Sequence, residues 1–380
     1  MIQKTRTKFW LAVATHIGFT VGVGLYGIPF AFQKSGFGVG LFFLIGLTLL
    51  VFLANLLYGE MILRTHERHQ YVGYVDKYLS PWARKVNLFI FWVAVYGGLV
   101  GVTVIAGEFL SIVFSPLIII SPAGFSGLFT AFAAILIFRG LRTVSKIDLT
   151  VLFFYLAIII TLGILGAGHI SPSNYKIIAG DFWFLPFGVV LFAMSSIMGI
   201  SLVREVLTGN EELLKKTLTF GTFIPAVFYL LFALLVVGVS GEATTPDAIS
   251  GLLGALGPNV VWMGSLFGLI TSSTLFLNLS TALKESFQED FRFRHRWAWF
   301  LAVLPPYLLF LTGVRNFIDI ISLVGGVGIG MKMFFSVWVH VQAKKHGDRI
   351  PEYSVRLPRP VLLLIMFVFL AGAVYTILVK

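Results

Sequence analysis

The sequence predicts an all-α polytopic membrane protein with eleven transmembrane helices, and three observations lead to this fold class. Hydrophobic residues make up 58% of the 380 positions and charged residues only 12%, about half the charged share of a soluble domain. Apolar segments approaching or exceeding the ~20 residues that cross a bilayer recur along the whole chain. Most of the 28 lysines and arginines fall on alternate connections, as the positive-inside rule requires.

The apolar segments can be placed in order along the chain. They lie at 9–33, 38–63, 86–114, 121–139, 147–167, 183–206, 217–240, 258–283, 298–312, 316–340 and 360–379. The ninth is short and contains Pro305 and Pro306. The basic connections at 284–296 and 344–359 should share one side of the membrane, so an even number of crossings separates them. We therefore expect the ninth segment to span as well, with a cytoplasmic N-terminus and an external C-terminus.

The first span has the most unusual local sequence. It carries Gly18, Gly22, Gly24 and Gly27, followed by Pro29. Glycine costs a helix about 1 kcal/mol relative to alanine, and proline costs about 3. Unsatisfied backbone groups in hydrocarbon cost several kcal/mol more. A span that accepts these costs is expected to open at mid-membrane, where its bare N–H and C=O groups suit a charged solute.

The chain divides into two matching halves. Segments one to five occupy 9–167 and segments six to ten occupy 183–340, and the odd number predicts a 5+5 inverted repeat. The sixth segment has Ser195, Ser196, Gly199 and Ser201 at its centre. Two interrupted helices in matching positions indicate a binding site, although small residues could serve close helix packing alone. Residues 1–340 are thus the expected core, and 341–380 a cytoplasmic connection with the eleventh helix.

Several motifs resemble those of a known family. The first-helix signature of the amino acid/auxin permease family is similar to Gly22-x-Gly24-x-x-x-Ile28-Pro29-Phe30-Ala31-Phe32-x-x-x-Gly36-Phe37-x-x-Gly40. Matches to later helices follow in order at Glu60 with Leu63-Arg64-Thr65, Tyr96-Gly97, Gly107-Glu108, Phe192-Ala193 and Thr271-Ser272-Ser273. Small prokaryotic aromatic amino acid permeases look similar too. The resemblance implies the amino acid–polyamine–organocation superfamily and the leucine-transporter fold, with helices 1 and 6 discontinuous.

The charge of the expected site indicates its ligand. Spans one, six and eight carry no acidic or basic residue through their central turns. Because an unpaired buried charge is expensive, a neutral site favours a zwitterion over a polyamine or a bare metal ion. The α-carboxylate is expected at the N-terminal end of the outer half of helix one. The predicted substrate-binding residues are Thr20, Gly22, Val23, Gly24, Ser195 and Ser196.

The coupling ion is predicted to be Na⁺ or H⁺. A sodium ion could take the carbonyls of Gly18 and Val21 and the hydroxyls of Thr271 and Ser272. The alternative is that these hydroxyls bond to the preceding helical turn, as Ser and Thr do in membranes. Protons would need a titratable group, for which His16, Glu60 and Glu108 are candidates. No other cofactor is expected.

Two further charged residues are candidates for gating or coupling. Lys332 lies within the tenth span and Asp319 near its outer end. An ionisable residue inside the membrane is a functional candidate, although Lys332, about two turns from the expected cytoplasmic end, could also snorkel to the interface. Asp319 could pair with Arg315 at i,i+4 or close an external gate with Lys34.

These observations predict a secondary active transporter in the plasma membrane that moves a neutral amino acid, with aromatic amino acids among the candidates, by alternating access. The alternatives are an exchanger without net ion coupling and a sensor that does not transport. An enzyme is not expected, because Gly22-x-Gly24-x-x-Gly27 lacks the βαβ context of a dinucleotide site. The net charge of +11 lies mainly on cytoplasmic connections. The expected partners are therefore an amino acid, the coupling cation and the lipid bilayer, without nucleic acid.

Overall fold

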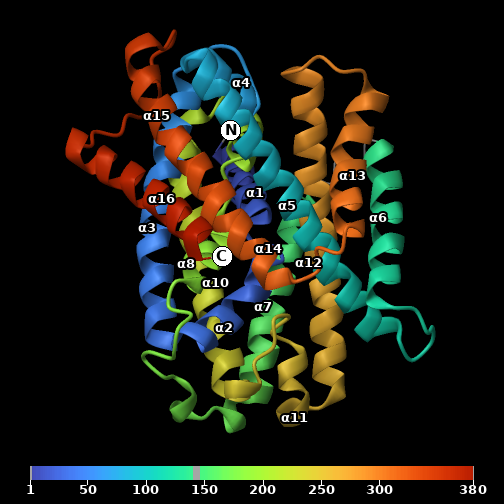
Figure 1. Ribbon diagram of the computed structural model, residues 1–380. Helices are drawn as coiled ribbons and strands as arrows, with labels where there is room; N and C mark the ends of the chain where they lie inside the picture. Colours follow the sequence, from blue (N-terminus) through green and yellow to red (C-terminus); the bar gives the residue numbers. More distant parts are fainter. Residues whose placement is uncertain (1, 140–145, 380) are drawn as a thin grey trace.

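The computed structural model describes residues 2–139 and 146–379, and this part of the chain is a bundle of helices without a strand (Figure 1). The helices of the first half are α1 (Ile2–Thr20), α2 (Gly24–Ser35), α3 (Phe37–Leu63), α4 (Tyr71–Tyr78), α5 (Pro81–Phe114), α6 (Pro122–Phe138) and α7 (Lys146–Gly166). Those of the second half are α8 (Leu185–Met194), α9 (Gly199–Val206), α10 (Leu214–Ser240), α11 (Leu253–Leu256), α12 (Pro258–Glu289), α13 (His295–Leu311), α14 (Phe317–Leu323), α15 (Gly330–His346) and α16 (Arg359–Val379).

Membrane-spanning helices account for most of this bundle. Within the described residues, seven stretches are long and apolar enough to cross a bilayer, and the bent pair α1–α2 makes an eighth. The predicted segments at 121–139, 147–167 and 298–312 correspond to the helices α6, α7 and α13, although α7 and α13 begin before the predicted bounds. Helix α13 continues through Pro305 and Pro306 without a break. The protein is therefore a multi-pass integral membrane protein.

The first span is broken where the glycines lie. Helix α1 ends at Thr20 and α2 begins at Gly24, and the two helices are bent by 53°. A Cβ atom at Gly24 would lie 2.6 Å from the Cα atom of Ala193 in α8, so only glycine allows the two segments to approach this closely. The predicted opening of the first span is confirmed.

The sixth span is broken at the matching position. Helix α8 ends at Met194 and α9 begins at Gly199, and the residues between them are not helical. The hydroxyl of Tyr229 in α10 lies 2.7 Å from the carbonyl oxygen of Thr20 and 2.8 Å from that of Ala193. One phenol thus bridges the last turns of α1 and α8, and the two breaks face each other.

The tenth span has an irregularity that the sequence did not predict. Between α14 and α15 lies the π-helical segment η6 (Val324–Ile329). A Cβ atom at Gly325 would overlap the carbonyl oxygen of Gly188 in α8, and one at Gly188 would overlap the carbonyl oxygen of Ser322. Backbone therefore packs directly on backbone between α8 and this span. π-Helical turns within α-helices occur frequently at functional sites.

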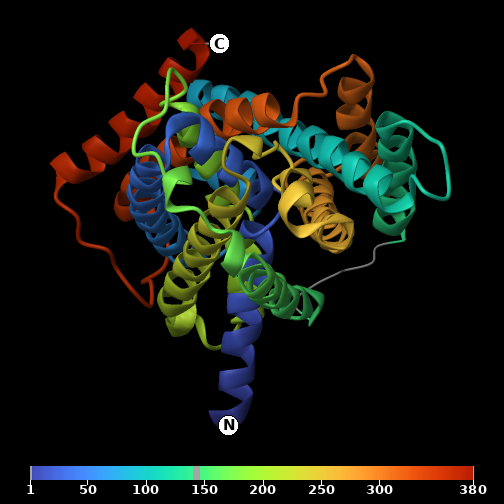
Figure 2. The ribbon, with the colours of Figure 1, turned by 90° about the horizontal axis from the view of Figure 1, so that it is seen from below.

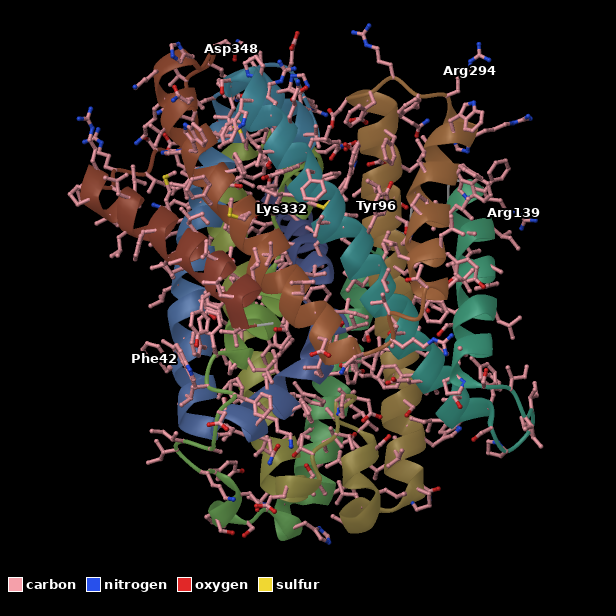
Figure 3. The ribbon with its side chains drawn as sticks, viewed as in Figure 1. Phe42, Tyr96, Arg139, Arg294, Lys332 and Asp348 are labelled. Carbon is pink, nitrogen blue, oxygen red and sulfur yellow. The ribbon has the colours of Figure 1, made fainter. Side chains whose placement is uncertain are left out.

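The polar connections gather at the two ends of the bundle. At one end, which we call the basic end, Asp348 forms a 2.6 Å ion pair with Lys77 of the short helix α4. Figure 3 shows Asp348 and Arg294 together at this end. At the opposite end, Lys176 pairs with Glu242 at 2.8 Å. Figure 2 shows the beginning of α1 projecting from one side of the bundle.

Candidate substrate site

A small cavity of about 40 Å³ lies between the two breaks. Thr20 and Gly24 line it from the first span, and Ser195 and Ser196 line it from the sixth. These are four of the six predicted substrate-binding residues. The other two, Gly22 and Val23, lie within the first break but do not line the cavity in this structure. The structure therefore brings four of the predicted residues together around one cavity, and their role in substrate binding stays a prediction.

The first break presents backbone N–H groups. The amides of Gly22, Val23 and Gly24 have no backbone acceptor among the described residues. Helix α2 begins here, so the positive end of its dipole adds to these donors. An anionic group such as a carboxylate fits this end of the break.

Carbonyl groups lie on the other side of the cavity. Helices α1 and α8 both end here, and each carries a partial negative charge at its C-terminal end. The oxygens of Thr20 and Ala193 accept the hydroxyl of Tyr229, which is fully buried. Donors on one side and acceptors on the other complement a zwitterion.

Asn55 of α3 is a buried polar residue that the sequence analysis missed. Its amide nitrogen donates to the hydroxyl of Ser196 at 3.3 Å and to that of Thr222 at 3.4 Å. Its side chain is fully buried. An isolated amide in an otherwise apolar span was the available signal, because such a group needs a buried partner.

Helix α5 supplies a wall of small residues. Ala94, Val95 and Gly98 line the cavity, and positions 94 and 98 lie on one face of the helix at i,i+4 spacing. On other sides the cavity is bounded by Phe192 and Leu275. Because Ala94 and Gly98 leave room between these apolar walls, the cavity suits a ligand with a bulky hydrophobic side chain.

A second, larger cavity of about 470 Å³ leads from the breaks toward the basic end. Phe19 and Met198 line both cavities, so these two side chains separate them. Five charged residues are among those that line the larger cavity, namely Arg68, Arg204, Glu205, Glu285 and Glu289. We call this larger cavity the vestibule. The candidate site is therefore approached from the basic end.

The carbonyl groups of the predicted sodium site already accept hydrogen bonds. The hydroxyl of Tyr155 in α7 donates to the Val21 oxygen at 2.5 Å. The amide of Asn278 in α12 lies 3.5 Å from the Gly18 oxygen. Helices α7 and α12 thus hold the end of α1 beside the first break.

The hydroxyl groups of that site bond to their own helix. Thr271 and Ser272 both donate to the carbonyl of Gly268, at 3.0 and 2.7 Å. This is the arrangement that the sequence analysis set against a sodium site. Each hydroxyl oxygen keeps lone pairs that do not take part in these bonds.

Glu60 lies at the basic end and does not line the central cavity. Its carboxylate accepts from the Arg64 guanidinium at 2.9 Å, the Ser354 hydroxyl at 2.9 Å and the Val355 amide at 2.6 Å. Glu60 thus binds the connection between α15 and α16 to the end of α3.

The remaining gating and proton candidates also lie away from the cavity. Glu108 is half-buried in the part of α5 nearer the opposite end. Asp319 and Lys34 both line a separate pocket of about 430 Å³ at that end. His16 is buried where α1 packs against Gly221 of α10. Neither these residues nor Glu60 contact the space between the breaks.

Lys332 is the exception, and its position decides between the two alternatives that the sequence left open. Helix α15 continues to His346, so Lys332 lies fourteen residues, about 21 Å at 1.5 Å per residue, from the helix end. Its side chain is 2% exposed and lines the central cavity. Figure 3 shows it inside the bundle, away from the basic end. The site therefore contains one basic group, and Lys332 does not snorkel to the interface.

Comparison with known families decides what kind of protein carries this site. The model of the tryptophan/tyrosine permease family matches residues 5–378, nearly the whole chain. The chain belongs to the tryptophan/tyrosine permease family. A search of curated proteins found no match. Among solved structures, the crystal structure of MhsT in complex with L-phenylalanine has a TM-score of 0.62 at 15% identity, covering 98% of both chains.

These similarities settle the coarse class of this permease. Its fold is that of MhsT, which is a leucine-transporter fold. It is a transporter rather than an enzyme, as the sequence predicted. The narrower assignment to the amino acid/auxin permeases stays a prediction.

Proposed function

We propose that this permease is a secondary active transporter that takes up a neutral amino acid, with aromatic amino acids as its main substrates, coupled to Na⁺ or H⁺. The observation that carries the proposal is the pair of facing breaks, with free amides on one side and carbonyls on the other. The name of the family and the L-phenylalanine bound to MhsT support an aromatic substrate.

The substrate is proposed to bridge the two breaks. Its carboxylate would bind the amides of Gly22, Val23 and Gly24, at the positive end of α2. Its ammonium group would bind the carbonyls of Thr20 and Ala193, which the Tyr229 hydroxyl contacts in this structure. Its side chain would lie against the small residues of α5.

The membrane topology proposed from the sequence fits this site. We propose that the protein lies in the plasma membrane with eleven spans in a 5+5 inverted repeat. Its basic end then faces the cytoplasm. The N-terminus is then cytoplasmic and the C-terminus external. Under this orientation the vestibule opens to the cytoplasm, and we propose that the conformation faces inward, with Phe19 and Met198 still closing the central cavity.

The size of the central cavity supports alternating access. About 40 Å³ is far below the ~300–1,000 Å³ of small-molecule sites. Phe19 and Met198 must therefore move toward the vestibule before an amino acid can occupy the space between the breaks. The same movement would open its path to the cytoplasm.

The driving force is proposed to come from a cation that enters with the substrate. Each charge that moves down the membrane potential contributes about 2.3 kcal/mol per 100 mV. A sodium ion would be held by the Gly18 and Val21 carbonyls and the Thr271 and Ser272 hydroxyls, whose free lone pairs are the support for such a site. A proton would need a titratable group in the cavity.

Uptake into proteoliposomes tests the proposal. We expect purified permease to accumulate radiolabelled L-tryptophan, L-tyrosine or L-phenylalanine above the external concentration when an ion gradient and an inside-negative potential are imposed. Replacing sodium by choline and adding a protonophore identify the ion. Counterflow without accumulation under any gradient would indicate an exchanger, and binding without either would indicate a sensor.

A further inference from the structure

We propose that Lys332 carries the coupling proton of this permease, and that its ammonium group forms an ion pair with the carboxylate of the transported amino acid. The inference rests on the proposed transport function and assigns its coupling step to one residue. It begins from the position of Lys332, which is buried within the bundle and lines the cavity between the breaks. No other residue lining that cavity carries an acidic or basic side chain.

The surroundings of Lys332 are aromatic. Its ammonium nitrogen lies 5.0 Å from the ring centre of Tyr71 in α4 and 5.6 Å from that of Phe91 in α5. These two rings stack with an interplanar angle of 11°. The Tyr71 hydroxyl is fixed by Asn87, 2.9 Å away, and by the Lys332 carbonyl, 3.2 Å away. Aromatic faces attract a cation but do not neutralise it.

Of the acidic groups on the surrounding elements, Glu60 and Asp76 are paired with other residues, and Glu108 lies in the part of α5 nearer the opposite end. Helices α3, α4, α5, α16 and the segment η6 pack against α15. From these elements, the titratable groups on the side of Lys332 are the phenols Tyr71 and Tyr58, whose rings lie 5.8 Å apart. The charged groups nearer the basic end form other interactions: Glu60 with Arg64, Asp76 with Arg84, Lys77 with Asp348, and His340 with the Leu57 carbonyl. Within the described residues, Lys332 has no carboxylate partner.

An unpaired ammonium group in an apolar site is costly. The carboxylate of an entering amino acid supplies the missing counter-charge. Protonation of Lys332 and substrate binding therefore favour each other, and by linkage each raises the affinity of the other by the same factor. In the loaded state the amine nitrogen has accepted a proton from external water and holds it as an ammonium ion.

Release follows the vestibule. When the carboxylate leaves past Phe19 and Met198 toward the basic end, the ammonium group loses its counter-charge and returns its proton to water there. One proton and one amino acid then cross together. The π-helical segment η6 ends three residues before Lys332, so a change in its winding would move this amine relative to the breaks.

Isothermal titration calorimetry on the purified permease, in sodium-free choline buffers, measures the proposed proton directly. Binding of L-tryptophan is compared in two buffers of different protonation enthalpy, and the difference in heat reports the protons taken up. We expect the unaltered permease to take up a proton with L-tryptophan. Tryptamine, which lacks the carboxylate, should bind without proton uptake or not at all. Binding of L-tryptophan without proton uptake would overturn the inference while leaving the transport function standing.

Variants separate coupling from a merely structural role. Lys332→Met should weaken L-tryptophan binding on the order of thirtyfold, because the substrate carboxylate loses its charged partner, and should abolish proton uptake. Lys332→Arg keeps a positive charge that cannot be deprotonated. It should bind and exchange L-tryptophan but lose proton-driven accumulation.

Lys215→Met, at an exposed position of α10, is the matched control. Proton uptake that persists in Lys332→Met would assign the proton elsewhere, whereas failure of the unaltered permease to bind any amino acid would reject the transport function itself.

Discussion

At the scale of single residues, the close approach of α2 and α8 depends on Gly24. We predict that Gly24→Val abolishes amino acid uptake, because a side chain there would collide with the backbone of Ala193. Radiolabelled uptake normalised to the amount of protein in the membrane is the measurement. Gly46→Val on α3, where nothing lies within 4 Å of an added Cβ, is the control and should transport normally. Normal uptake by Gly24→Val would move the substrate site away from the break.

Tyr229 offers a second test at this scale. Tyr229→Phe removes the hydroxyl that bridges the Thr20 and Ala193 carbonyls. We expect about a tenfold loss in uptake, since a lost buried hydrogen bond costs roughly 1–3 kcal/mol. Tyr96→Phe removes a similar bond to the Leu301 carbonyl, outside the cavity. Comparable losses in both variants would mean that Tyr229 serves stability alone.

The positions of the two helix breaks followed from the sequence because the local chemistry there was unusual. Four glycines and a proline in one span made the first break predictable, and Ser195 and Ser196 indicated the second. Tyr229, Asn55 and the small residues of α5 were missed because a tyrosine, an amide or an alanine in a span has many ordinary uses. Their roles depend on which helices pack together, which no local pattern specifies.

At the scale of elements, the connection between α15 and α16 is held by Glu60. We predict that Glu60→Gln loosens this connection, because the carboxylate accepts bonds from Arg64, Ser354 and Val355. Limited proteolysis should cut 347–358 faster, and the melting temperature should fall. Transport should keep its dependence on the proton gradient. If that dependence disappeared with the connection intact, Glu60 would be the coupling residue instead.

Element boundaries show where prediction from the sequence stops. Hydropathy located a helix at each of the eleven segments, because apolar length is a direct signal. It missed α4, which lies in a polar connection, and it ended the tenth span six residues before His346. The predicted boundary was placed at 340 because basic residues follow that position. The extra turns moved Lys332 from near the interface to the centre of the bundle.

At the scale of the whole molecule, the vestibule predicts which side of the membrane reaches the site. The chain has no cysteine, so Thr281→Cys in the vestibule lining would be the only thiol. We expect a membrane-impermeant maleimide to label it from the cytoplasmic side. Ser173→Cys, exposed at the opposite end, should be labelled only from outside. Labelling of position 281 from outside alone would reverse the proposed orientation.

The contact between α8 and the tenth span has a consequence for the working cycle. Gly188 and Gly325 meet through bare backbone, with no side chains between them whose rotation could absorb a displacement. We predict that these two segments move together if the protein alternates between two open states as proposed. Helix α8, whose Phe192 forms one wall of the space for the solute, would then carry along the stretch of helix that leads directly to the buried amine of Lys332.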